Sequence, residues 1–418
     1  MSKNNADFFK EKNKWSEIKD RLLRCYLAPY FQKVLLTKKP IFYVDCFAGK
    51  GRFEDGKPGS PLIALTVREE CFQRTRRQDL DGAIQTCFID LNYADDLRSN
   101  IASVHPSHDA PKVIHGKYEE EIEKCLRNKG GYNVFLYIDP YGIKALDSKQ
   151  FDRFQTFHFH TFEMLINFNS FGFFRDACQA LRVDYSQDEA FQDLGDLVEY
   201  DPTIVSATRK SIDLLTNIAG GDYWKRIVRD YPQKINGYQA EQRLSTEYKR
   251  RLREKYKYVL DMPICLKPGQ HPKYRMIHVS NHESGCFLMA QNMLKRKDEL
   301  YREIQSDGQE QISIFDSNPD MCSSIEGGWI TKKEVEEKVE AFIANMKKDF
   351  GITEFVAEFM SEHGLLCEFK MLYDILDTMQ NRKMIQIIRN PAVKQGGKLR
   401  KFWEEKSSQT VTIRRLCR

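Results

Sequence analysis

Several common sequence signals are missing from this 418-residue chain. It has no run of 18 apolar residues, the length that a membrane-spanning helix needs, and its charged beginning lacks the apolar core of a secretory signal. Its eleven cysteines, from Cys25 to Cys417, are scattered singly, and none forms a CxxC pair. Such an unpatterned set argues against a disulfide framework or a zinc module. We therefore expect a reduced, cytoplasmic protein.

Motifs for metal and phosphate chemistry are missing as well. The chain has no HExxH string and no Cys/His cluster, and the stretch 49–53 lacks the Lys-Ser/Thr pair of a P-loop. His115, His158 and His160 stand singly near predicted strand ends, where core or surface roles are more common than metal binding. We expect no metal site.

Charge is present but unevenly distributed. The net charge is +5, yet residues 382–418 carry eleven Lys or Arg and two Glu, so the rest of the chain is mildly acidic. A basic end on an acidic body favours contact with a polyanion, usually nucleic acid, although a solvated basic tail has the same composition.

Short apolar segments alternate with helical patterns along the first part of the chain. Strands are predicted at 41–45, 86–90, 112–116, 134–139 and 162–168, and helices between them at 61–74, 92–104 and 117–129. This alternation is typical of βαβ units in a doubly wound parallel sheet. An amphipathic helix over 13–36 precedes them and is expected to supply core and no site residue.

The remaining chain divides into three parts. Residues 170–255 are mostly helical and form an insertion, and strands at 258–266 and 275–282 are expected to close the sheet edge, so that the first domain spans 1–304. A polar linker is predicted at 305–328. Residues 329–418 combine helices at 332–348, 353–364 and 369–384 with strands at 385–390 and 409–415, which resembles a winged-helix module. Its turn supplies the candidate nucleic-acid-binding residues Lys394, Lys398, Arg400 and Lys401.

The stretch 44-VDCFAGKGRFEDGKPGSP-61 is a long glycine-rich loop after the first strand. Gly49 and Gly51 let the backbone pass close to a ligand. In a dinucleotide-binding fold the helix begins at the glycines, so that its N–H groups meet a pyrophosphate. Here the helix is expected to begin only at Ser60 and Pro61. This detour suits a ligand with an amino-acid tail and no phosphate, such as S-adenosylmethionine (SAM). Asp45 would face its ammonium group. A merely flexible loop is the alternative.

Other candidate residues lie at or just after the ends of strands, where ligands of open parallel sheets bind. Phe47 joins the cofactor-binding candidates on the first loop. Asp90 follows the second strand and could accept both ribose hydroxyls, or instead cap the next helix.

The string 137-YIDPYG-142 ends another strand with an acid, a proline and an aromatic residue. Asp139 and the carbonyl of Pro140 would accept hydrogen bonds from an exocyclic amine, and Tyr141 would stack on the base. These three are the candidate catalytic residues. A proline-containing turn is the alternative.

Several segments together resemble the three-Cys-motif partner (TcmP) family. They are 14-KWSEIKDRLLRCYLAPYFQ-32, 43-YVDCFAGKGRFEDGKPGSPLIAL-65, 137-YIDPYG-142 and 164-MLINFN-169. The resemblance covers roughly residues 10–300; Lys50 stands where the family commonly has proline. It implies a Rossmann-like, SAM-methyltransferase-type domain and a partner protein that carries the three cysteines and is radical-SAM-like. The Asp-Pro-Tyr-Gly string also resembles that of tRNA dimethylguanosine methyltransferases, whose target is an exocyclic amine.

Two functions fit these observations. The first is a SAM-dependent N-methyltransferase that acts on a base of DNA or RNA. The second is a non-catalytic nucleic-acid-binding partner in which the Rossmann domain is a degenerate scaffold.

Overall fold

The computed structural model describes residues 10, 12, 14–75, 83–105, 110–195, 206–231, 233–265, 272, 274–307, 321–323, 329–393, 403, 405 and 409–416. Its contacts divide the chain into two compact units, residues 1–259 with 263–281 and residues 260–262 with 282–418. Helix α12 (Glu283–Asp307) belongs to the second unit, whereas the predicted first domain extends to residue 304.

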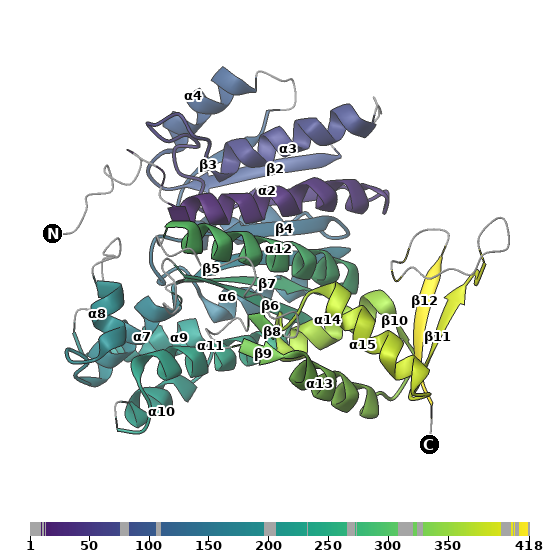
Figure 1. The fold of residues 1–418 in the computed structure, drawn as a ribbon. Helices are drawn as coiled ribbons and strands as arrows, with labels where there is room; N and C mark the ends of the chain where they lie inside the picture. Colours follow the sequence, from purple (N-terminus) through teal and green to yellow (C-terminus); the bar gives the residue numbers. More distant parts are fainter. Residues whose placement is uncertain are drawn as a thin grey trace. The chain divides into compact units, whose positions relative to one another are not determined.

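A mixed seven-stranded sheet of order β3-β2-β1-β4-β5-β7-β6 organises the first unit (Figure 1). The first five of these strands pair in parallel, and β7 runs antiparallel to β5. The strands are β1 (Ile41–Asp45), β2 (Ile84–Asp90), β3 (Lys112–His115), β4 (Asn133–Ile138), β5 (Thr161–Phe168), β6 (Tyr258–Ile264) and β7 (Tyr274–Ser280). The predicted α/β class is confirmed.

Helices cover both faces of this sheet. Those before and between the first five strands are α2 (Lys14–Leu35), α3 (Ser60–Thr75), α4 (Ala94–Val104), α5 (Tyr118–Leu126) and α6 (Ser148–Phe154), with a short 3-10 turn at Gln155–Phe157. The predicted insertion consists of α7 (Ser170–Leu181), α8 (Glu189–Gly195), α9 (Arg209–Ala219), α10 (Tyr223–Asp230) and α11 (Gly237–Arg253). Helices α2 and α3 lie side by side on one face (Figure 1).

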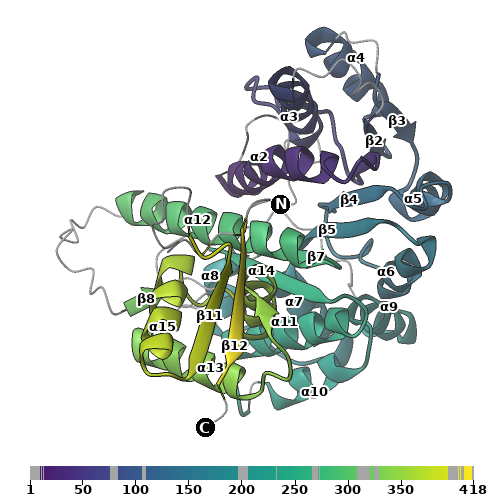
Figure 2. The same ribbon diagram turned by 90° about the vertical axis from the view of Figure 1, so that its right-hand side faces the viewer.

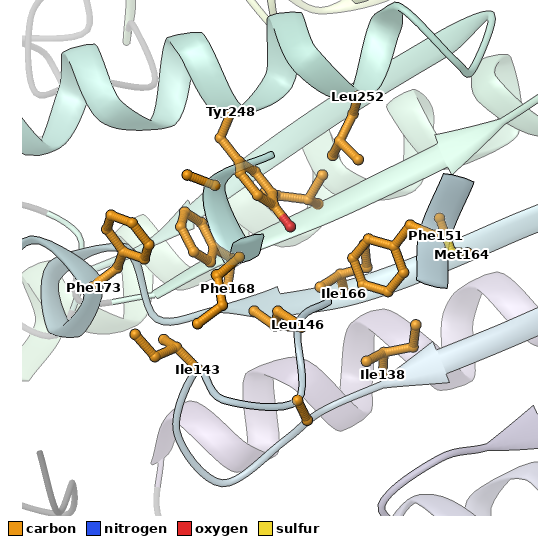
Figure 3. Packing of buried hydrophobic residues seen from close by; sticks show 14 of the residues in the cluster. Ile138, Ile143, Leu146, Phe151, Met164, Ile166, Phe168, Phe173, Tyr248 and Leu252 are labelled. Carbon is orange, nitrogen blue, oxygen red and sulfur yellow. The ribbon is translucent and has the colours of Figure 1, made fainter. Parts of the chain in front are cut away.

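The opposite face carries the large hydrophobic core. Alternate residues of β4 and β5, such as Ile138 and Ile166, pack under α7 and α11, which contribute Phe173, Tyr248 and Leu252 (Figure 3). Because side chains alternate along a strand, the remaining residues of these strands point toward the face that α2 covers. The ring of Tyr26 on α2 lies 5.6 Å from that of Phe135 on β4, which confirms this assignment.

The second unit contains a separate three-stranded sheet of order β10-β12-β11. Its elements are α12, β8 (Met321–Ser323), β9 (Trp329–Thr331), α13 (Lys332–Ala344), β10 (Phe350–Gly351), α14 (Ile352–His363), α15 (Phe369–Asn381), β11 (Ile385–Asn390) and β12 (Thr410–Arg415). Strands β11 and β12 form an antiparallel ribbon (Figure 2). The sequence therefore placed the two ribbon strands correctly, together with the helices α13, α14 and α15.

None of the helices in the described ranges is long and apolar enough to cross a membrane. Among the described residues, no disulfide joins any two of the cysteines Cys25, Cys46, Cys71, Cys87, Cys125, Cys178, Cys265, Cys286 and Cys367.

Candidate functional site at the carboxyl ends of the strands

The glycine-rich loop is an ordered structure tied to the neighbouring strands. The N–H of Cys46 donates to the carbonyl of Tyr137 on β4 (2.9 Å), and the N–H of Ala48 donates to that of Ile89 on β2 (3.0 Å). Helix α3 begins at Ser60, one residue before the predicted start at 61. The loop is thus held across β2, β1 and β4, at the edge where an α/β sheet binds ligands.

The two glycines of this loop adopt a conformation that other residues rarely take. Gly49 and Gly51 have φ angles of 60° and 76°. A Cβ on Gly51 would lie 2.6 Å from Cδ1 of Leu97 on α4, so the positive φ and this close approach together favour glycine at this position. The loop conformation accounts for both glycines, and whether a ligand also approaches them stays a prediction.

Asp45 is fully buried, and one of its two carboxylate oxygens has no hydrogen-bond partner among the described residues. One carboxylate oxygen, Oδ1, accepts the N–H of Phe47 (3.2 Å), whereas Oδ2 has no hydrogen-bond partner within the described part of the chain. Burial raises the pKa of this carboxyl from 3.8 to about 7, and a side-chain hydrogen bond from Ser60 and the N–H of Phe47 offset only part of this effect. A buried oxygen without a partner costs free energy, so this position is suited to a donor from outside the protein.

Asp90 holds the loop and the start of α4 together. Its Oδ1 accepts the N–H groups of Asn92 (2.8 Å) and Tyr93 (2.7 Å), and its Oδ2 accepts that of Gly49 (2.8 Å). Asp90 therefore holds the turn that leads into α4 and does not cap the helix, whose N-cap residue Tyr93 has no side-chain cap. A carboxylate offers about four acceptor positions, so one remains for a ribose hydroxyl.

Asp139, just after β4, is the centre of a hydrogen-bond network. Nζ of Lys19 on α2 lies 2.8 Å from Oδ1 and 2.7 Å from Oδ2. The amide of Asn167 on β5 donates to Oδ1 (2.7 Å), and the hydroxyl of Tyr137 donates to Oδ2 (3.1 Å). The predicted amine acceptor is thus engaged within the protein.

The strand register explains why these groups meet. Asp45 is level with Tyr137 in the β1–β4 pair, and Ile138 is level with Ile166 in the β4–β5 pair, which places Asp139 beside Asn167. All of these polar side chains therefore belong to the face that α2 covers. Three adjacent strands bring them to one edge.

Helix α2 contributes charged groups to this site, so the expectation that it supplies core alone is wrong. Lys12, just before the helix, pairs with Asp20 and donates to the carbonyl of Pro58 in the glycine-rich loop (2.6 Å). Burial raises the pKa of Asp20 to about 6, although Lys12 and Lys19 lower it. Lys19 itself could have indicated this role in the sequence, because a lysine on the apolar face that includes Ile18 and Leu22 is unusual.

The remaining candidates lie around this centre. Phe47 packs against Tyr118 on α5, with ring centroids 5.1 Å apart. Pro140 is buried, and the side chain of Tyr141 is 53% exposed. An exposed ring is compatible with stacking on a base. The basic candidates Lys394, Lys398, Arg400 and Lys401 lie outside the described residues.

In the described ranges, no group of three or more His, Cys, Asp or Glu side chains is arranged to hold a metal ion.

A scan against protein-family models found no match, and a search of curated proteins found none either. Among solved structures, the chain is similar to the plantazolicin methyltransferase BamL, crystallised with a triazolic desmethylPZN analog and SAH. The identity is 12% and the TM-score 0.29, over 64% of this chain and 87% of that one.

Proposed function

We propose that this protein is a SAM-dependent N-methyltransferase that acts on an exocyclic amine of a nucleic-acid base. The observation that carries the proposal is Asp45, a buried carboxylate with one unpartnered oxygen at the edge where Rossmann-like sheets bind ligands. Its free Oδ2 fits the ammonium group of an amino-acid tail, because that group brings both a positive charge and N–H donors.

The cofactor-binding residues in this proposal are those of the loop and of β2. Asp45 holds the ammonium group, Phe47, Gly49 and Gly51 shape the loop, and Asp90 offers its remaining acceptor position to the ribose. SAM supplies an electrophilic methyl group when it is bound. Asp139, Pro140 and Tyr141, after the adjacent strand β4, position the amine that receives it.

Titration calorimetry with SAM, S-adenosylhomocysteine and NAD⁺ tests this assignment. We expect the first two to bind and NAD⁺ not to bind. Asp45→Asn should weaken SAM binding at least about tenfold, because a charge-assisted hydrogen bond to the ammonium is lost. Glu54→Gln is the matched control, because it removes an exposed carboxylate from the same loop. Equal effects of both changes, or no SAM binding, would contradict the proposal.

The nucleic-acid part of the proposal concerns the second unit. Its order of α13, β10, α14, α15, β11 and β12, with three antiparallel strands, supports a winged-helix module. Helix α15, which would be the recognition helix, exposes Asp374 and Asp377, and these carboxylates disfavour insertion beside phosphates. We therefore assign the phosphate contacts to the basic residues Lys394, Lys398, Arg400 and Lys401, which follow β11 in the sequence.

Fluorescence anisotropy with a labelled oligonucleotide at two salt concentrations tests this contact. A fourfold variant should bind more weakly and with less dependence on salt. It carries Gln in place of Lys394, Lys398, Arg400 and Lys401. Changing Lys333 and Lys338 to Gln is the control, because both are exposed on α13. An unchanged salt dependence in the fourfold variant would exclude the four residues that it changes.

The second candidate function is a nucleic-acid-binding scaffold for the radical-SAM-like partner that the family resemblance implies. It is favoured by the intramolecular contacts of Asp90 and Asp139, which occupy most of the acceptor positions that a catalytic site would need. Oligonucleotide binding together with no SAM binding, and co-purification with the three-cysteine protein, would support it.

A further inference from the structure

The acceptor positions of Asp139 are fully used. A carboxylate accepts about four hydrogen bonds, and Asp139 receives four. Oδ1 takes one from Lys19 (2.8 Å) and one from Asn167 (2.7 Å). Oδ2 takes one from Lys19 (2.7 Å) and one from Tyr137 (3.1 Å). A substrate amine can therefore bind Asp139 only if one of these donors leaves.

The three donors differ in how easily they can leave. Tyr137 and Asn167 are buried residues of β4 and β5, and their backbones are fixed in the sheet, Tyr137 in the parallel β4–β5 ladder and Asn167 in the antiparallel β5–β7 ladder. Lys19 reaches Asp139 from a different element, through a flexible four-carbon side chain. Its Nζ also lies 6.0 Å from the ring centroid of Tyr274, which can hold a positive charge by a cation–π interaction. Lys19 is the donor that can be exchanged.

Lys19 provides two of the four hydrogen bonds, one to each oxygen of Asp139. A primary exocyclic amine also carries two N–H donors and can replace both contacts. Because the side chains of Lys19 and Asp139 are 10% and 21% exposed, the ion pair is partly shielded from water and costs more to break than a surface pair.

We propose that Lys19 occupies the amine-binding position of Asp139 and is displaced by a nucleobase with a primary exocyclic amine. Lys19 thereby determines specificity: an oxo group at the same position would face the carboxylate with another acceptor and cannot displace the ammonium group. This inference rests on the proposed function, because that function supplies the amine.

Nucleotide pairs that differ in this one group test the inference. Binding of AMP and IMP, and of CMP and UMP, is measured by calorimetry at pH 7.5 with saturating S-adenosylhomocysteine. In Lys19→Met we expect the amine-bearing member of at least one pair to bind about tenfold more tightly than in the unchanged protein, because no charged hydrogen bonds must be broken. IMP and UMP should not gain.

Lys33→Met is the matched control, since Lys33 is exposed on the same helix, and it should change nothing. If Lys19→Met does not fold, Lys19→Gln retains an uncharged amide N–H₂ group and should show a smaller gain in the same direction. The double variant Lys19→Met/Asp139→Asn should lose the gain.

The outcomes separate the inference from the proposed function. Unchanged or weaker AMP and CMP binding in the Lys19 variants, or equal gains for IMP and UMP, would overturn the role of Lys19. A failure to bind S-adenosylhomocysteine in every variant would instead refute the methyltransferase assignment, and the nucleotide titrations without it would then decide the role of Lys19 alone.

Discussion

The carboxyl of Asp45 should make the folded protein less stable as the pH rises, and Asp45→Asn should remove this effect. Burial raises the pKa of Asp45 from 3.8 to about 7. The folded state therefore binds more protons than the unfolded state between these values, so this carboxyl destabilises the fold progressively from about pH 4 to about pH 7. Above that range its contribution is constant.

The magnitude follows from the pKa difference. About three pKa units correspond to roughly 4 kcal/mol at pH 8, as an upper bound. Asn at position 45 would bury an N–H₂ group where Oδ2 of the aspartate has no hydrogen-bond partner. Leaving these donors unsatisfied costs about 1–3 kcal/mol. We expect Asp45→Asn to be more stable than the unchanged protein by about 1–3 kcal/mol at pH 8, with no gain near pH 4.

Urea unfolding at pH 4, 6 and 8, followed by far-ultraviolet circular dichroism, measures the difference. The exposed Glu54 again provides the control, because Glu54→Gln should leave the pH dependence unchanged. A difference between Asp45→Asn and the unchanged protein that does not vary with pH, or a loss of stability at pH 8, would refute the reasoning from burial. A confirmed gain would mean that Asp45 makes the protein less stable than Asn would at the same position. Such a loss of stability is common at ligand-binding sites.

Three further predictions concern other positions. Asp139→Ala should abolish methyl transfer while leaving SAM binding within a few-fold, measured with labelled SAM and by calorimetry; equal loss of both would count against its assigned role. Gly51→Ala should destabilise the first unit by about 1–3 kcal/mol in denaturant unfolding, because of its positive φ and the close approach of Leu97; an unchanged midpoint would show that the loop can rearrange. Glu241→Gln should cost about 3 kcal/mol in the same measurement, because Glu241 and Arg275 form an ion pair in which each side chain is only 1% exposed; a neutral effect would mean that water reaches Arg275.

Much of the fold could be predicted from local patterns. The predicted strands of the first unit lie within two residues of the observed ones, because strands buried on both faces read as short apolar runs. The start of α3 at Ser60 was predictable from its capping residue and proline. Helix α12 was not predicted, and its residues up to 304 were assigned to the first domain, because the grouping of segments depends on contacts between distant parts of the chain.

The candidate site was predicted only in part. Asp45, Asp90 and Asp139 were identified because strand ends in a parallel sheet share one edge. Their partners could not be predicted in the same way. Lys19 and Asp139 are 120 residues apart in the sequence, and only the packing of α2 against the sheet brings them together.

The sequence by itself determined the alternation of strands and helices, the long glycine-rich loop and the acidic residues that follow the strands, because these depend on local propensity and spacing. Only the tertiary structure decided how many acceptor positions of each acid remain for a ligand. Asp90 and Asp139 are engaged by the N–H groups and the ammonium that folding places beside them, whereas Asp45 keeps a buried oxygen without a partner. A hydrogen bond joins groups through space, and its partners are fixed only when distant segments have packed.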